Sequence, residues 1–345
     1  MKLLESNRYI DDLRKAISNT NLSDLTGKTI FITGGLGLIA SAIADVLIVD
    51  GKTTIYIGAR SEQKFQKRFS GYEAVKFVQY DALVDFDSSI RPDYIICGAG
   101  LASPKLYTTM PVETVLSNFD GVHTLLEFAK HNSTSRLLYI SSSEVYGKKV
   151  SIDPFIEGEY GVIDIDNIRS SYAIAKRASE MLCKAYTSEY GVDTIIVRPG
   201  HVYGPSAQKS DKRLSSDFAY KAANGENLEM KSSGLQKRSY CYSVDCAIQI
   251  LTALISGESG QAYNIGNDSV TTIKKLAELY AKAGNVELIT KNPTEEELKT
   301  FNPMRNSSLD NRKVKELGYR DTFSVEEGVN HTVEILKDIS QCHYK

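Results

Sequence analysis

The stretch Thr33-Gly34-Gly35-Leu36-Gly37-Leu38-Ile39-Ala40 places three glycines between two apolar segments. Residues 29–32 before it predict a buried parallel strand, and apolar residues recur at helical spacing from Ile39 to Leu47. The glycines therefore occupy a turn from strand to helix, where free N–H groups of the helix N-terminus can bind a phosphate. This context, with Ala40 small enough for the helix to pack on the strand, predicts a dinucleotide-binding turn.

The composition argues against several classes of protein. The 345 residues are 42% hydrophobic and 24% charged with a net charge of −2, which is typical of a globular protein and gives no support for nucleic-acid or membrane binding. We expect neither a signal peptide nor a membrane-spanning helix, because the apolar runs are too short. The five cysteines are odd in number and lack metal-site spacing, which predicts a reducing, cytoplasmic location and no metal site.

Strand and helix patterns alternate from Lys28 onward. This predicts an α/β Rossmann fold, a doubly wound parallel sheet with helices on both faces and a smaller C-terminal substrate-binding lobe. The expected strands are Thr29–Thr33, Thr54–Gly58, Val75–Tyr80, Tyr94–Gly98, Leu137–Ser141 and Thr194–Val197. The expected helices are Val112–Lys130, Ser171–Tyr190, Asp217–Asn224, Ser243–Ile255, Thr272–Ala283 and Ser324–Lys337, the last with a capping box of Ser324 and Glu327.

The expected division of the chain follows these patterns. Residues 1–26 form an N-terminal helical extension, and residues 27–198 form the Rossmann domain, to which residues 236–266 return. Residues 199–235 and 267–345 form the substrate-binding lobe.

Tyr172 and Lys176 are four residues apart in a helical stretch and therefore share one face. A neighbouring ammonium group favours the phenolate and lowers the pKa of a tyrosine, which could then take a proton from a sugar hydroxyl as hydride leaves the same carbon. The segment Ser141-Ser142-Ser143-Glu144 follows an expected strand, at the edge of a parallel sheet where ligands bind. We expect Ser142 to bond the substrate oxygen and Glu144 to have a chemical role, because burying a carboxylate is costly.

With these residues the chain resembles the extended short-chain dehydrogenases/reductases, in the branch of nucleotide-sugar epimerases, dehydratases and decarboxylases. The resemblance runs from Thr33 to about Asp310 and includes three further motifs: Asp81-Ala82, Arg198-Pro199-Gly200-His201-Val202-Tyr203-Gly204-Pro205, and Gln236-Lys237-Arg238 with Val244-Asp245. It implies that Tyr172, Lys176 and Ser142 are catalytic, that Asp81 holds the adenine, and that Arg238 and Arg305 bind the substrate diphosphate.

The cofactor and substrate contacts implied by the glycine turn and by the resemblance form two sets. The expected cofactor-binding residues are Gly34, Gly35, Leu36, Gly37, Leu38, Ile39, Arg60, Asp81, Ala82, Ala99, Gly100, Leu101, Ser141, Tyr172, Lys176, Pro199 and Val202. The expected substrate-binding residues are Ser103, Tyr107, Ser142, His201, Arg238 and Arg305.

Two segments resemble UDP-glucuronate decarboxylases in particular. They are Ser142-Ser143-Glu144-Val145-Tyr146-Gly147 and Leu101-Ala102-Ser103-Pro104 with Tyr107, Pro111 and Asn118. Sugar 4,6-dehydratases have an aspartate where this chain has Ser143, so simple dehydration is disfavoured. A 4-epimerase, an NDP-4-ketosugar reductase and a catalytically silent NAD(P)-sensing protein remain alternatives.

The resemblance implies a three-step reaction. Tyr172 takes the proton of the C4 hydroxyl while NAD takes the C4 hydride. The 4-ketone then accepts the electron pair released as the C5 carboxylate leaves as carbon dioxide. A proton reaches C5 through Glu144 and Ser143, and the hydride returns to C4.

Cofactor choice and substrate contacts depart from the usual pattern. The acid expected after the second strand is replaced by Gly58, and Arg60 follows it. The resemblance favours NAD, which is the expected cofactor. Arg60 would allow NADP by accommodating a 2′-phosphate, or would lie exposed over the adenine. His201 stands where many relatives have asparagine, and Ser206 stands where decarboxylases often have arginine.

A homodimer is the expected partner state. Relatives commonly pair the two helices that correspond to Val112–Lys130 and Ser171–Tyr190, which gives a four-helix bundle. Phe119, Leu126, Leu182 and Ala185 could supply the apolar contacts, and packing in the core of the subunit explains them equally well.

Overall fold

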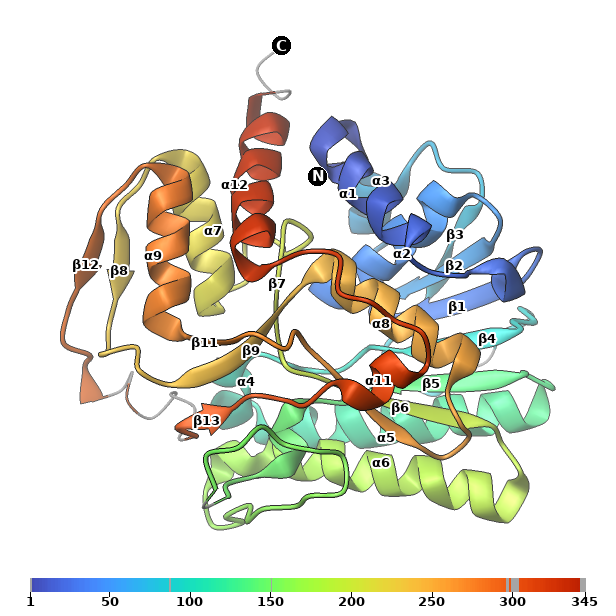
Figure 1. Ribbon diagram of the computed structural model, residues 1–345. Coiled ribbons are helices and arrows are strands. Elements are labelled where there is room, and N and C mark those ends of the chain that lie inside the picture. Colours follow the sequence, from blue (N-terminus) through green and yellow to red (C-terminus); the bar gives the residue numbers. More distant parts are fainter. Residues whose placement is uncertain (1, 87, 150, 296–297, 299–303, 342–345) are drawn as a thin grey trace.

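A seven-stranded parallel sheet forms the centre of the computed structural model, which describes residues 2–86, 88–149, 151–295, 298 and 304–341 (Figure 1). Its strand order is β10-β6-β5-β4-β1-β2-β3. The strands are β1 (Thr29–Thr33), β2 (Thr54–Ala59), β3 (Val75–Gln79), β4 (Tyr94–Cys97), β5 (Arg136–Ile140), β6 (Thr194–Pro199) and β10 (Ala262–Ile265). The predicted Rossmann fold is therefore confirmed, and the six predicted strands end within two residues of their observed limits.

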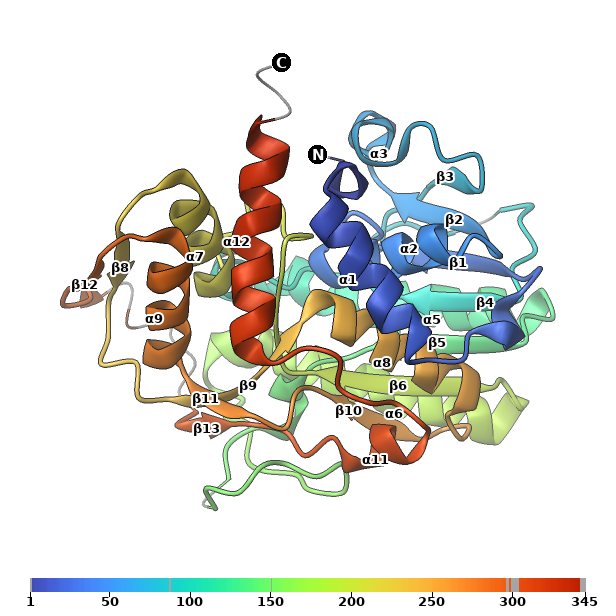
Figure 2. The ribbon, with the colours of Figure 1, turned by 45° about the horizontal axis from the view of Figure 1, so that its top comes forward.

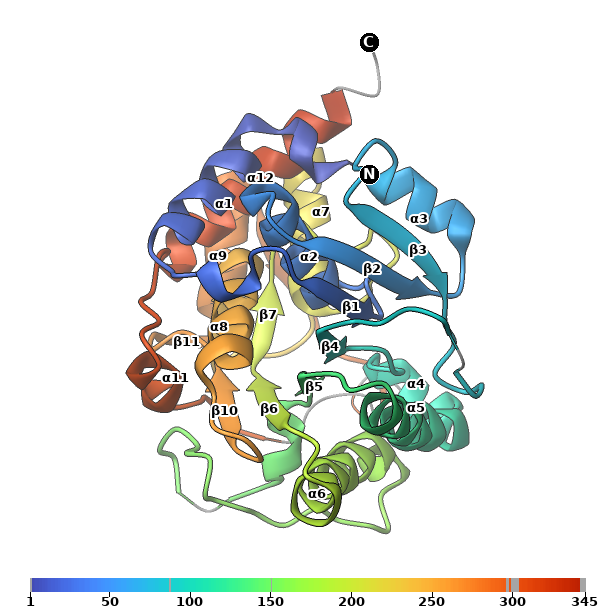
Figure 3. The same cartoon turned by 90° about the vertical axis from the view of Figure 1, so that its right-hand side faces the viewer.

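Helices cover both faces of this sheet, as Figure 3 shows along the strands. One face carries α2 (Leu38–Asp50), α3 (Glu62–Phe69) and α8 (Ser243–Ser256), and the other carries α5 (Pro111–His131) and α6 (Ser171–Tyr190). Alternate residues of β1 supply the two cores. Ile30 and Ile32 are buried with the first group, whereas Phe31 stacks on Phe86 at 5.2 Å between ring centroids in the second.

The first 26 residues pack on the body of the protein. They contain η1 (Leu3–Glu5), α1 (Asn7–Ser18) and η2 (Ser23–Leu25). The Tyr9 hydroxyl donates to the buried Asp45 carboxylate at 2.9 Å, and Asp12 accepts a hydrogen bond from Tyr242 at 2.8 Å. Hydrogen bonds to two distant parts of the chain therefore fix this helix, which lies beside the C-terminal helix in Figure 2.

In the described residues, the second lobe contains helices α7 (Leu214–Asn224), α9 (Ile273–Gly284) and α12 (Val325–Gln341) and two small sheets, seen on the left of Figure 1. The short α11 (Arg312–Glu316) lies nearer the main sheet. One sheet contains β11 (Val270–Thr272), β9 (Lys237–Tyr242), β13 (Asn306–Ser307) and β7 (His201–Tyr203), and the other contains β8 (Leu228–Met230) and β12 (Leu288–Thr290). Of residues 236–266, which were expected to return to the Rossmann domain, β9 lies in a small sheet, whereas α8 packs on the main sheet and β10 pairs with β6 in it.

Several smaller expectations can be compared with the structure. Ser324 and Glu327 form the predicted capping box, with Glu327 Oε2 accepting from Ser324 N at 2.8 Å and Ser324 Oγ accepting from Glu327 N at 3.2 Å. Leu126 is fully buried in the core between α5 and the sheet, which confirms core packing over contact with a second subunit for this residue. Within the described ranges no helix is long and apolar enough to cross a bilayer. Four cysteines are buried and free, and Cys342 lies outside the described residues.

Candidate active site

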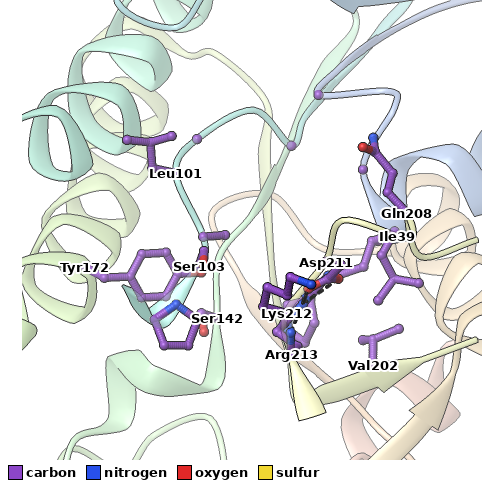
Figure 4. Close-up of a pocket in the computed structure, with 18 of the residues that line it drawn as sticks. Ile39, Leu101, Ser103, Ser142, Tyr172, Val202, Gln208, Asp211, Lys212 and Arg213 are labelled. Carbon is purple, nitrogen blue, oxygen red and sulfur yellow. Dashed lines mark hydrogen bonds and ion pairs between the residues drawn. The ribbon is translucent and has the colours of Figure 1, made fainter. Parts of the chain in front are cut away.

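A cavity of about 1070 Å³ lies at the carboxyl ends of the central strands, between the sheet and the second lobe. Figure 4 shows Tyr172, Ser142 and Ser103 on one side of it and Ile39, Val202 and Asp211 to Arg213 on the other. Nine lysine or arginine residues line the cavity against six aspartate or glutamate residues, although the whole chain has a net charge of −2. The excess of cations suits an anionic ligand such as a diphosphate.

The glycine turn leaves backbone exposed at one end of the cavity. Gly34 has φ +67°, and a Cβ there would lie 2.7 Å from Gly98 O, so only glycine fits. Gly37 is the N-cap of α2 and lines the cavity, so the helix N-terminus opens into it. Gly35 does not line the cavity, and a Cβ there would lie 2.7 Å from the Ile57 side chain. Gly35 is therefore required for packing on β2 and not for ligand contact.

The predicted cofactor residues other than Gly35 all line this one cavity. Gly100 is another close-approach position, because a Cβ there would lie 2.5 Å from Asn118 Oδ1. Asp81 lies farther along, and its carboxylate accepts a hydrogen bond from Leu83 N at 3.0 Å. The lining of the cavity therefore includes exposed glycine backbone, a helix N-terminus and a carboxylate, which fits a dinucleotide.

Tyr172 and Lys176 lie on the first two turns of α6, beside the end of β5. Lys176 Nζ donates to Ile140 O at 2.8 Å and lies 4.7 Å from the ring centroid of Tyr139. The Tyr107 ring, from the short helix α4 (Pro104–Thr109), stacks on Tyr172 with 4.4 Å between centroids and 5° between planes. Both predicted catalytic side chains are thus buried and held in place, Lys176 by its hydrogen bond to Ile140 O and Tyr172 by its stacking on Tyr107.

The pKa of Tyr172 differs from the sequence-based expectation. Burial and the nearby Glu144 carboxylate raise the pKa of Tyr172 to about 12, and a hydrogen bond with Ser142 opposes this shift. Burial also lowers the pKa of Lys176 to about 8. The expectation that the ammonium group dominates the tyrosine and lowers its pKa is therefore wrong for this arrangement. The phenol is protonated at neutral pH until a further positive charge or hydrogen bond favours the phenolate.

Glu144 forms a two-point ion pair inside the cavity. It lies in the turn η3 (Ser143–Tyr146), which Ser142 caps by accepting from Glu144 N at 3.2 Å. Arg169, in η4 (Ile168–Ser170), donates to its two oxygens at 3.0 and 3.1 Å. Both side chains are mostly buried. This geometry fixes the carboxylate beside Tyr172 and brings a guanidinium group to the same end of the cavity.

The predicted substrate residues separate into two groups. Ser103, Tyr107, Ser142, His201 and Arg238 line the cavity, whereas Arg305 is exposed and is absent from its lining. Arg238 is 2% exposed, donates to the carbonyls of Lys237 and Met304 at 2.8 and 3.1 Å, and pairs with no carboxylate in the described part of the chain. Burial lowers its pKa, so a bound anion would stabilise it. Burial together with Arg238 and Arg213 lowers the pKa of His201 to about 3, which keeps its imidazole neutral.

The family follows from comparison with known proteins. The model of the NAD-dependent epimerase/dehydratase family matches residues 30–266, which is more than half of the sequence. The chain belongs to this family.

Two curated relatives and one solved structure illustrate the similarity. UDP-glucuronic acid decarboxylase 5 of Arabidopsis thaliana is 31% identical over 308 residues, which cover 87% of this chain and 86% of the relative. UDP-glucuronic acid decarboxylase 1 of Xenopus tropicalis is 29% identical over 323 residues, covering 92% and 74%. The structure of UDP-glucose 4-epimerase from Thermotoga maritima with UDP-glucose has a TM-score of 0.78 at 25% identity, covering 90% of this chain and 99% of that one.

Sequence reasoning alone misses Arg169, Gln208 and Arg213, which line the cavity of this epimerase/dehydratase family member. Arg169 lies three residues before Tyr172, and this i, i+3 spacing could have indicated that the two side chains lie near each other. Arg213 pairs with Asp211, with Nε 2.9 Å from Oδ2, in a loop where no periodicity marks it. Gln208 and Ser206 of the same loop donate to Leu36 O at 2.7 Å and Leu38 O at 2.9 Å. The loop between β7 and α7 is therefore tied across the glycine turn.

Proposed function

We propose that this family member is a nucleotide-sugar enzyme that oxidises C4 of its substrate transiently, and that it decarboxylates a UDP-linked uronate. The observation that carries the proposal is the Glu144–Arg169 ion pair, which lies in the same cavity as Tyr172, Lys176 and Ser142. The relatives at about 30% identity, which are named as UDP-glucuronic acid decarboxylases, support the choice of substrate.

Tyr172 is the proposed base for the C4 hydroxyl. Ser142 lines the same cavity and opposes the rise in the pKa of the phenol, so its hydroxyl is the proposed second contact of the same substrate oxygen. A bound NAD supplies a hydride acceptor and a positive charge that favours the phenolate. Lys176, held on Ile140 O, adds a second cation below the ring. These residues remove the proton as the C4 hydride leaves, which produces a 4-ketone.

Decarboxylation requires an electron sink next to the carbon that loses the carboxylate. In a 4-keto uronate the ketone accepts the electron pair of the C5–carboxylate bond, and a proton then adds at C5. Arg169 places a guanidinium group where a sugar carboxylate can be bound, and Ser143 and Glu144 are the proposed route for the proton. Arg238, buried without an anion among the described residues, is the proposed partner of the diphosphate.

The proposal is tested by supplying the purified protein with UDP-glucuronate labelled with ¹⁴C in the carboxyl group. We expect labelled carbon dioxide and a UDP-pentose, with no net reduction of added cofactor. Formation of a C4-inverted uronate without carbon dioxide would favour the second candidate, a 4-epimerase. That candidate is supported by the structural similarity to UDP-glucose 4-epimerase, and it needs the same 4-ketone.

A homodimer through α5 and α6 is part of the proposal. These two helices pack side by side, and each carries exposed apolar side chains. The exposed residues are Val112, Val115, Leu116, Ile174 and Met181, with Met181 65% exposed. Val112, Val115 and Leu116 are spaced i, i+3 and i+4 on α5, and Ile174 and Met181 are spaced i and i+7 on α6, which suits a four-helix bundle.

Replacing Met181 with aspartate is expected to convert the dimer to a monomer. The carboxylate would lose its hydration in the centre of the helix pairing, which costs several kcal/mol. Sedimentation velocity at micromolar protein measures the change. Leu235→Asp, at an exposed leucine outside both helices, is the control and should leave the oligomeric state unchanged. A monomeric wild-type protein would contradict the dimer.

A cytoplasmic location is also part of the proposal. Its support is the four buried cysteines, which are free thiols in this fold.

A further inference from the structure

The end of β2 determines what the dinucleotide site presents to the adenosine ribose. In dinucleotide-binding folds a carboxylate near this point bonds the ribose 2′-hydroxyl. Here the position is Gly58, where a Cβ would lie 2.9 Å from the Phe31 ring and 3.2 Å from Tyr80 Cβ. The core against β2 therefore excludes any side chain at residue 58, including a carboxylate.

The next side chains that reach the cavity are cationic or neutral. Ala59 is 8% exposed, and Arg60, Ser61 and Lys64 then line the cavity together. Neither the Arg60 guanidinium nor the Lys64 ammonium group makes an ion pair with any residue that the structure describes. Ser61 Oγ accepts from Lys64 N at 3.3 Å as the cap of α3, which leaves its hydroxyl proton available to a ligand.

The neighbouring carboxylates that the structure describes make no ion pair with Arg60 or Lys64. Asp81 also lines the cavity; it follows β3, and one of its oxygens accepts a hydrogen bond from Leu83 N. Glu62, next to Ser61, is exposed and is absent from the lining. Two unpaired cations and a hydroxyl therefore meet at the ribose end of the cavity without a facing carboxylate from α3.

We infer that Arg60, Ser61 and Lys64 form a binding site for the 2′-phosphate of the dinucleotide, so that this protein binds NADP more tightly than NAD. The inference rests on the dinucleotide site of the proposed function and adds the cofactor specificity of this chain. An arginine near the end of the second strand can accommodate a 2′-phosphate, and a guanidinium group binds two phosphate oxygens at once. Because the hydride is returned to the substrate in the proposed reaction, either cofactor would serve the chemistry.

Calorimetric titration of the full-length protein, freed of co-purified dinucleotide, with NADP⁺ and separately with NAD⁺ tests this inference. We expect NADP⁺ to bind wild-type protein at least about 10-fold more tightly, and Arg60→Ala to weaken NADP⁺ binding by about 10- to 100-fold, as for other hydrogen bonds to charged groups. Arg60→Ala should change NAD⁺ binding by less than about threefold, because NAD lacks the 2′-phosphate.

Lys64→Ala and Lys67→Ala make a matched pair on α3. Both lysines are exposed, but only Lys64 lines the cavity. Only Lys64→Ala should weaken NADP⁺ binding. Equal or tighter binding of NAD⁺ by the wild-type protein, or equal weakening of both cofactors by Arg60→Ala, would overturn the inference and leave the proposed function standing. Failure of both cofactors to bind would overturn both.

Discussion

Replacing Tyr172 with phenylalanine is expected to lower turnover of the nucleotide sugar by about 10²- to 10⁴-fold, the usual contribution of a positioned acid or base. The change removes one oxygen atom and keeps the ring that stacks on Tyr107 at 4.4 Å between centroids. Fold and dinucleotide affinity should therefore be retained. The measurement is the single-turnover rate at saturating substrate, with thermal unfolding and cofactor titration on the same preparation.

Tyr190→Phe provides the matched control for this experiment. Tyr190 is the last residue of the same helix, is 47% exposed and is absent from the cavity lining. Its replacement should leave turnover unchanged. If Tyr172→Phe retained more than about a third of the wild-type rate, proton removal by this phenol would be excluded as the step that limits chemistry.

Replacing Arg198 with methionine is expected to lower the free energy of unfolding by about 3–5 kcal/mol, because it leaves a buried carboxylate without its partner. The Arg198 side chain is 0% exposed. It donates to Glu180 at 2.6 to 3.2 Å, to Tyr146 Oη at 3.0 Å and to Glu157 O at 2.8 Å. Ser141 Oγ also donates to Glu180 at 2.6 Å, so the network joins β5, β6 and α6 behind the site.

Urea unfolding at 25 °C measures this loss, and two comparisons test its cause. The double variant Arg198→Met with Glu180→Leu should recover much of the loss, because both buried charges are then absent. Arg8→Ala breaks the exposed pair with Glu334 and should change stability by less than about 1 kcal/mol. A loss of similar size in the single and double variants would show that packing, and not the unpaired charge, determines the effect.

The periodic parts of the molecule were predictable from sequence. The strand-to-helix pattern around Gly34 and the apolar runs of β1 to β6 gave the parallel sheet, because side-chain period and burial are local properties of the chain. Most of the residues expected in the site lie in one cavity, because the carboxyl ends of parallel strands meet at one edge.

The remaining features depend on contacts between distant segments. The pairing of Glu144 with Arg169 joins residues 25 apart, and the hydrogen bond from Gln208 to Leu36 joins residues 172 apart. The raised pKa of Tyr172 follows from burial, which the four-residue spacing to Lys176 does not reveal. Leu126 and Leu182 lie on the two helices of the expected dimer contact, but only the structure shows that Leu126 packs against the sheet.

The central claim is that C4 of the sugar is oxidised and reduced again by the same enzyme molecule. It is tested most directly with UDP-glucuronate carrying deuterium at C4, followed by nuclear magnetic resonance of the product. We predict carbon dioxide release and a UDP-pentose that keeps the deuterium at C4, because the hydride that leaves is the hydride that returns. A product with hydrogen at C4, or net reduction of the cofactor in step with turnover, would contradict the account.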